Sequence, residues 1–213
     1  MAMNKTTNQA PESPSPGQRG SADHERRHQI IAAADEHFRL YGYRKTSVAD
    51  LGKAIGVSST YLYRFFSSKQ AIGEAVCATV LERMEAELRS VVDGPGTATQ
   101  RLRRFMQLTL ERSLEIFFDG TRLHELVISA MEESWGTATT HESVLLGMTR
   151  ELVQAGRSSG EFERKTPIDE VAVGISEAMR LFAHPVALQF RPREQLEAAL
   201  AAVASLVLRS LAP

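Results

Sequence analysis

Residues 46–69 read TSVADLGKAIGVSSTYLYRFFSSK, and this stretch decides the fold of the N-terminal part of the chain. Ser47 and Asp50 stand three residues apart in the Ser-x-x-Asp pattern of a capping box, which predicts a helix start. Gly56 tolerates the left-handed conformation that ends a helix. The pattern therefore predicts two short helices joined by a glycine-centred turn, a helix-turn-helix.

Apolar residues recur at helical spacing on both sides of this turn. The preceding helix is expected over residues 23–41, with Gly42 ending it and a buried stripe of Ile31, Ala34, Phe38 and Tyr41. The helix after the turn is expected over residues 59–66, burying Leu62 and Phe65. A second capping box at Ser67–Gln70 should open a long helix that runs to about residue 91.

The second helix of a helix-turn-helix enters a DNA major groove, so its outward side chains are candidate DNA contacts. Tyr61 and Tyr63 diverge by about 200° on a helix, which leaves at least one of them exposed. Lys69 lies in the first turn of a helix, where the dipole disfavours a cation, and a nearby phosphate would remove that penalty. The alternative is that Lys69 points into water, as surface lysines usually do.

The run from Thr46 to Lys69, with Leu-Tyr-x-x-Phe at residues 62–66, resembles the N-terminal domain of TetR-family transcriptional regulators over about residues 25–75. The resemblance implies phosphate contacts from Thr46, Ser47, Tyr63 and Lys69, and base contacts from Ser59, Thr60, Tyr61 and Arg64, with Ser58 beside them. Gly52 stands where the family usually has alanine, and we expect a slightly weaker helix. The family resemblance also implies a homodimer on a palindromic double-stranded DNA operator with half-sites ~34 Å apart.

Composition indicates a globular protein, with 43% hydrophobic and 24% charged residues over 213 positions. Residues 1–22 are rich in Pro, Gly, Ser and Thr and are expected to form a disordered tail. The net charge is -1, but residues 23–69 are basic and the rest of the chain is acidic. Cys77 is the single cysteine, and the sequence lacks an apolar stretch of membrane-spanning length, so a cytoplasmic location without membrane association is expected.

The chain from residue 70 to 213 is also expected to be helical, which makes the predicted fold all-α, with an N-terminal DNA-binding domain over residues 23–69 and a larger effector-binding and dimerisation domain. Glycines and prolines divide it into helices near 100–118, 121–135, 141–155, 167–185 and 193–211.

A small-molecule pocket in the middle helices is hypothesised from Phe105, Met106, Phe117, His124, Met131, Trp135 and Met148. Dimerisation is hypothesised for the last two helices through Val171, Ile175, Met179, Leu196, Leu200, Val203 and Val207. Core packing alone would also explain both sets.

Catalytic and metal-binding motifs are incomplete. The segment beginning at His124-Glu125 has Ile128 where a zinc-protease motif needs its second histidine, and no phosphate-binding loop or nucleophile elbow occurs. The sequence therefore predicts a regulator without cofactor, metal or catalytic residues. Two alternatives stay open at this point: an enzyme with an appended DNA-binding domain, and a helical protein-interaction module that does not bind DNA.

Overall fold

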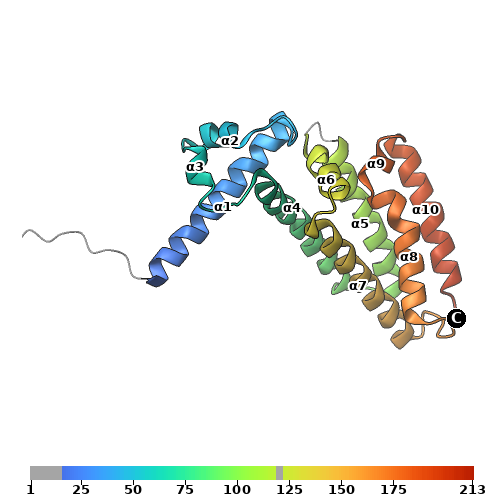
Figure 1. Cartoon of the computed structure of the whole chain (residues 1–213). Helices are drawn as coiled ribbons and strands as arrows, with labels where there is room; N and C mark the ends of the chain where they lie inside the picture. The colour runs from blue at the N-terminus through green and yellow to red at the C-terminus, as the bar shows by residue number, and fades with distance from the viewer. Residues whose placement is uncertain (1–15, 119–121) are drawn as a thin grey trace, which may run out of the picture.

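The computed structural model of the chain describes residues 16–118 and 122–213, apart from the side chains of residues 16–21, 117–118 and 185–186. Within these residues the regular secondary structure is helical and contains no strand, which confirms the expected all-α fold (Figure 1). No helix of the described segments is long and apolar enough to cross a bilayer.

Helix α1 spans Pro16–Tyr41 and packs against α2 and α4. It begins earlier than expected, so the predicted tail was wrong for residues 16–22, while residues 1–15 lie outside the described part. Its buried stripe contains Ile30, Ile31, Ala34 and Phe38. Tyr41 was wrongly placed in that stripe, because its side chain is exposed and its ring lies 4.5 Å from that of His37.

Helices α2 (Val48–Ile55), α3 (Ser59–Leu62) and α4 (Lys69–Val92) follow. Helix α3 is shorter than predicted because the chain turns after Leu62, and this turn buries Phe66 while Phe65 is only half-buried. The predicted start of α4, with Ser67 as N-cap, was wrong by one residue. Its N-cap is Ser68, whose hydroxyl accepts a hydrogen bond from the Ala71 amide at 3.0 Å.

The larger part comprises α5 (Ala98–Phe118), α6 (Leu123–Glu132), α7 (Gly136–Ser159), α8 (Ile168–Ala183), α9 (Pro185–Leu188) and α10 (Arg193–Ser210). The helix expected near residues 167–185 is interrupted at Pro185: α8 ends before it and α9 begins at it, since proline cannot donate the backbone hydrogen bond that would continue α8. Gly156 does not end α7 as expected. It lies inside the helix, where the absence of a side chain admits the Phe162 ring, since a Cβ atom there would stand 2.1 Å from that ring. The C-cap is instead Gly160, with φ of 79°.

Two hydrophobic clusters form the core, and α4 contributes to both. The first joins α1, α2 and α3 to the N-terminal half of α4, to α6 and to Trp135. The second joins the C-terminal half of α4 to α5, α7, α8 and α10. Helix α4 therefore runs without interruption from the small N-terminal group of helices into the larger bundle (Figure 1).

Candidate nucleic-acid interface and cavity

The capping box at the start of α2 is confirmed by its hydrogen bonds. The Asp50 amide donates to the Ser47 hydroxyl at 3.1 Å, and the Ser47 amide donates to the Asp50 carboxylate at 2.9 Å. The Ser47 hydroxyl also donates to that carboxylate, which lowers the pKa of Asp50. Ser47 remains exposed at the helix N-terminus, where backbone amides favour an anion.

The turn between α2 and α3 depends on two glycines. Gly56 has φ of 75° and caps α2, as the sequence predicted. Gly52 lies where the turn crosses α2, and a Cβ atom at this position would stand 2.7 Å from the Val57 carbonyl oxygen. Glycine at residue 52 therefore permits the turn before α3 to approach α2 closely, and this contact sets the angle between α2 and α3.

Helix α3 and the turn after it present polar side chains outward. The Ser58 hydroxyl caps α3 by accepting from the Tyr61 amide at 3.2 Å. Leu62 faces the core, whereas the exposed or half-exposed side chains are Ser58, Ser59, Thr60, Tyr61, Tyr63 and Arg64. The Arg64 guanidinium lies 5.6 Å from the centre of the Tyr61 ring, which is within cation–π range. The structure thus brings these six predicted residues together on one short segment.

Lys69 lies at the first position of α4, between this segment and the end of α1. Its ammonium group lies 4.4 Å from the centre of the Tyr43 ring and donates to the Arg44 carbonyl at 3.4 Å. Partial burial lowers the pKa of Lys69, and the nearby Glu133 carboxylate opposes that shift. The protein therefore holds this cation in place, near the exposed Arg44 and Lys45 side chains.

Thr46 does not fit its predicted role as a side-chain phosphate contact. It is 3% exposed, and its hydroxyl donates to the Gly42 carbonyl at 2.7 Å. Arg27 is a candidate that sequence reasoning missed. Its guanidinium lies 4.7 Å from the centre of the Phe66 ring, and it lines a small hollow beside Arg64. Because Arg27 and Arg64 are nearly forty residues apart in the sequence, sequence patterns did not indicate that they lie close together.

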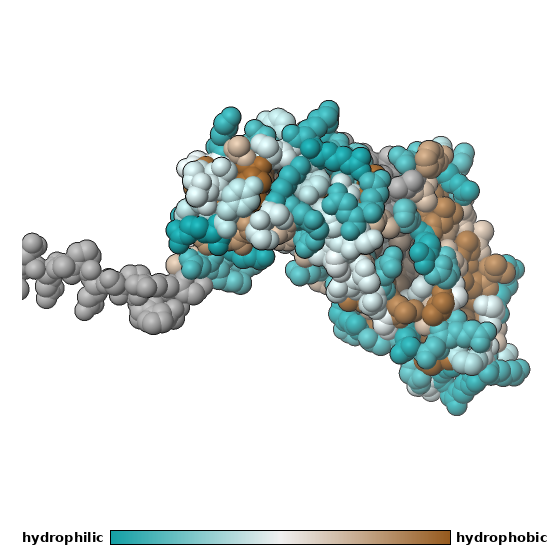
Figure 2. Space-filling view, viewed as in Figure 1, coloured by the Kyte–Doolittle hydropathy of each residue, from teal (hydrophilic) through white to brown (hydrophobic). Residues whose placement is uncertain are grey.

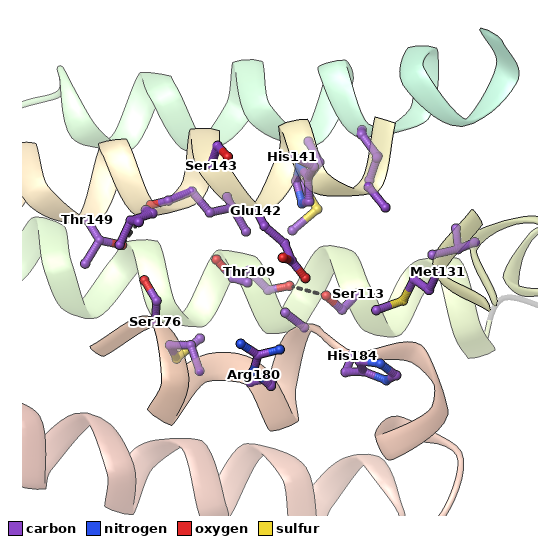
Figure 3. A pocket seen from close by; sticks show the side chains of 18 of the residues that line it. Thr109, Ser113, Met131, His141, Glu142, Ser143, Thr149, Ser176, Arg180 and His184 are labelled. Carbon is purple, nitrogen blue, oxygen red and sulfur yellow. Dashed lines mark hydrogen bonds between the residues drawn. The ribbon is translucent and has the colours of Figure 1, made fainter. Parts of the chain in front are cut away.

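A cavity of about 320 Å³ lies in the C-terminal bundle, within the range of roughly 300 to 1,000 Å³ that is usual for ligand sites. Five helices contribute to it: α4, α5, α6, α7 and α8 (Figure 3). Its lining is mainly apolar and includes Leu81, Met84, Phe105, Val127, Met131, Leu145, Leu146 and Met179. Such a cavity can hold a largely apolar small molecule.

The structure separates the predicted pocket residues into three groups. Phe105 and Met131 line the cavity. Met106, Trp135 and Met148 were wrongly assigned, because they are buried in the two cores, and His124 is not among the lining residues either. The side chain of Phe117 lies outside the described residues.

Buried hydroxyl groups on the cavity wall were missed by the sequence analysis. Thr109, Ser113 and Thr149 each donate their proton to the backbone carbonyl four residues earlier. Their oxygens consequently remain available as hydrogen-bond acceptors. The Ser176 hydroxyl is buried without a partner in the described part of the chain. Hydroxyl residues within apolar helices, with Thr109 and Ser113 at four-residue spacing, were the signal that could have found this wall.

The predicted dimer stripe mostly closes the core of the single chain. Residues Ile175, Met179, Leu196, Leu200 and Val207 are buried there, while Val171 and Val203 are half-buried. Helix packing within the single chain already covers these five, so their predicted role in an interface gains no support from exposed surface. The large apolar residues that α8 and α10 leave exposed are Val173, which lines the cavity, and Leu206 on α10, and Figure 2 shows hydrophobic residues gathered on the α10 side.

No group of three or more His, Cys, Asp or Glu side chains within residues 16–118 and 122–213 is placed to hold a metal ion.

The outward surface of α3 and the fold around it define a helix-turn-helix DNA-binding transcriptional regulator. Residues 30–76 match the family described as bacterial regulatory proteins, tetR family, and residues 98–204 match the tetracyclin repressor-like C-terminal domain. The chain belongs to the TetR family, which consists of transcriptional regulators.

Individual proteins agree with this assignment. The transcriptional regulator HbdR of Aromatoleum sp. is 33% identical over 78 residues, which cover 37% of this chain and 34% of HbdR. The regulator EthR of Mycolicibacterium smegmatis is 23% identical over 69% of this chain and 68% of its own length. A TetR-family regulator from Pectobacterium atrosepticum shares the fold, with a TM-score of 0.73 and 21% identity over 90% of this chain and 96% of that one.

Proposed function

We propose that this chain is a homodimeric repressor that binds a palindromic DNA operator through α3 and releases it when a small molecule occupies the cavity. The observation that carries the proposal is the clustering of Thr60, Tyr63 and Arg64 on one exposed segment beside Lys69. Hydroxyl, phenol and guanidinium groups are those that contact phosphates and base edges. The repressing direction is supported by the tetracyclin repressor-like C-terminal domain.

Dimerisation is supported by the surface of α10. Leu206 is a large apolar side chain of this helix that the single chain leaves 63% exposed. Several alanines of α10 permit close helix approach. A second copy on this face would give the protein two α3 helices, as a palindromic operator requires.

Helices α4 and α6 supply the coupling between cavity and DNA-binding surface. Helix α4 starts at Lys69 and carries Cys77, Leu81 and Met84 into the cavity wall. Helix α6 contributes Val127 and Met131 to the wall, and its Glu132 forms an ion pair with Arg44 just before α2. A ligand that favours a different arrangement of these helices would change the separation of the two α3 helices, and hence operator affinity.

The test is a DNA-binding titration over a series of salt concentrations, using the DNA beside the gene and searching it for an inverted repeat. We expect affinity to fall steeply as salt rises, because bound phosphates release counterions. The Arg64→Ala variant should lose roughly tenfold or more and change its preference among operator variants. The control is Lys165→Ala, which removes an exposed cation between α7 and α8.

Two results would contradict the proposal. Binding that is indifferent to salt would favour the protein-interaction alternative. Equal losses of operator affinity in the Arg64 and Lys165 variants would show that α3 does not contact the DNA.

A further inference from the structure

The exposed residues of the cavity lining all belong to α7 and α8, so we call this part of the lining the opening, and three of its side chains are charged. Glu142 comes from α7, and Glu177 and Arg180 come from α8. Figure 3 shows Glu142 directed from its helix toward the wall that carries Thr109 and Ser113, with Arg180 on the opposite side. Two carboxylates and one guanidinium thus lie at the opening, and the imidazoles of His141 and His184 also line the cavity.

These three groups are unequally paired. Glu177 forms two hydrogen bonds with Arg180, from Nε at 2.9 Å and from Nη2 at 2.5 Å. Glu177, on the same helix, therefore compensates the charge of Arg180. Glu142 forms no hydrogen bond and no ion pair with the residues that the structure describes, although its charge acts on Arg180 at longer range. Glu142 is thus the carboxylate of the opening that has no directly bonded counter-charge.

The polar atoms deeper in the cavity also favour a hydrogen-bond donor as ligand. Thr109 and Ser113 are 2% and 6% exposed, and their hydroxyl protons are already donated to the backbone. Their oxygens accept hydrogen bonds but have no proton left to donate. The buried, unpartnered hydroxyl of Ser176 adds a further acceptor, which also has a free proton. The remaining wall is mainly apolar.

We propose that the cavity binds an amphiphile with an apolar body and a cationic, hydrogen-bond-donating head group, and that Glu142 is the counter-charge that selects it. A cation enters an apolar cavity at low cost only when an opposite charge and acceptors replace its water. A carboxylate or a coenzyme A thioester would instead meet the unpaired negative charge of Glu142. That such a molecule is the effector rests on the proposed function.

The test compares ligands that share a ten-carbon chain and differ in the head group. The probes are decylammonium, decanol, decanoate and decanoyl-coenzyme A, titrated by calorimetry into the full-length protein below micelle-forming concentrations. Decylammonium should bind most tightly. In the Glu142→Gln variant it should weaken roughly tenfold, the loss expected for a charge-assisted hydrogen bond, while decanol binding should change little. The control is Glu82→Gln, an exposed glutamate of α4 that does not line the cavity.

The outcomes separate ligand class from function, because operator binding is measured on the same samples. The proposal is overturned if none of the four probes binds, if decanoate or decanoyl-coenzyme A binds as tightly as decylammonium, or if Glu142→Gln and Glu82→Gln behave alike. Decylammonium that binds through Glu142 without releasing DNA would support the ligand class and reject its role as effector. Failure of the protein to bind any DNA would reject the proposed function alone.

Discussion

The ring of Tyr43 meets the ring of Trp135 edge-on, with centroids 5.4 Å apart and planes at 79°. Tyr43 follows α1 and Trp135 precedes α7, and both are buried. Burial raises the pKa of Tyr43 to about 12, so its phenol stays neutral at physiological pH. Gly73 of α4 lies against both rings, since a Cβ atom there would stand 2.8 Å from each. This contact fixes α4 between the DNA-binding helices and the cavity helices.

Replacing Gly73 with alanine should therefore destabilise the protein although alanine favours helix. The added methyl group would overpack the two rings, at a cost of about 1–3 kcal/mol in the free energy of unfolding, measured by chemical denaturation. The matched control is Gly147→Ala, because a Cβ atom at that position in α7 meets nothing within 4 Å. That variant should be stabilised by up to about 1 kcal/mol. Equal effects of the two substitutions would contradict this account.

Introducing a charge on the exposed face of α10 should prevent dimerisation. Leu206→Glu would place a carboxylate where the proposed second copy packs, and sedimentation should then detect a monomer with weakened operator affinity. Leu40→Glu changes a similarly exposed leucine on α1, and this control should remain dimeric. A dimeric Leu206 variant would place the interface elsewhere.

Glu161 should make stability depend on pH in the acid range. Its carboxylate accepts hydrogen bonds from the amides of Thr99 and Ala98 at the start of α5, and these bonds lower its pKa from 4.5 to about 2. Because the folded-state pKa is lowered, this stabilisation is present above pH 4.5 and is lost as pH falls toward 2. Glu161→Gln should be less stable than the parent at pH 7, and the difference should shrink at pH 3. A difference independent of pH would show that the charge of Glu161 is unimportant.

The thiol of Cys77 should be unreactive in the folded protein. It is 1% exposed, and burial raises its pKa to about 11. The thiolate is the reactive form, so alkylation by iodoacetamide at pH 8 should be far slower in the native than in the unfolded protein. A ligand in the cavity should slow it further, because Cys77 lies on the cavity wall. Native labelling at the rate of a free thiol would refute this.

The helix-turn-helix could be predicted because its determinants are local. The Ser47–Asp50 capping box and the Gly56 turn each depend on a few consecutive residues, and both form as predicted. The errors inside this region come from longer-range packing. Thr46 is buried by its bond to Gly42, and the turn after Leu62 exchanges Phe65 for Phe66 in the core.

The cavity was much harder to predict. Helical periodicity marks a side chain as inward-facing, but it does not distinguish a packed core from an open cavity. Phe105 lines the cavity and the adjacent Met106 is fully buried in the core, although both are large, apolar and on the same helix. Glu142 was overlooked because its significance depends on Thr109 and Arg180, which belong to two other helices.

The amino-acid order alone determined that this chain is helical and that it carries a DNA-reading motif, because capping, turn formation and helix amphipathicity act over a few neighbouring residues. Only the tertiary structure decided which apolar residues line a cavity, which face of α8 and α10 stays uncovered, and where an unpaired carboxylate stands. Those properties depend on how five helices, distant in the chain, approach one another, and side-chain packing between them fixes that approach.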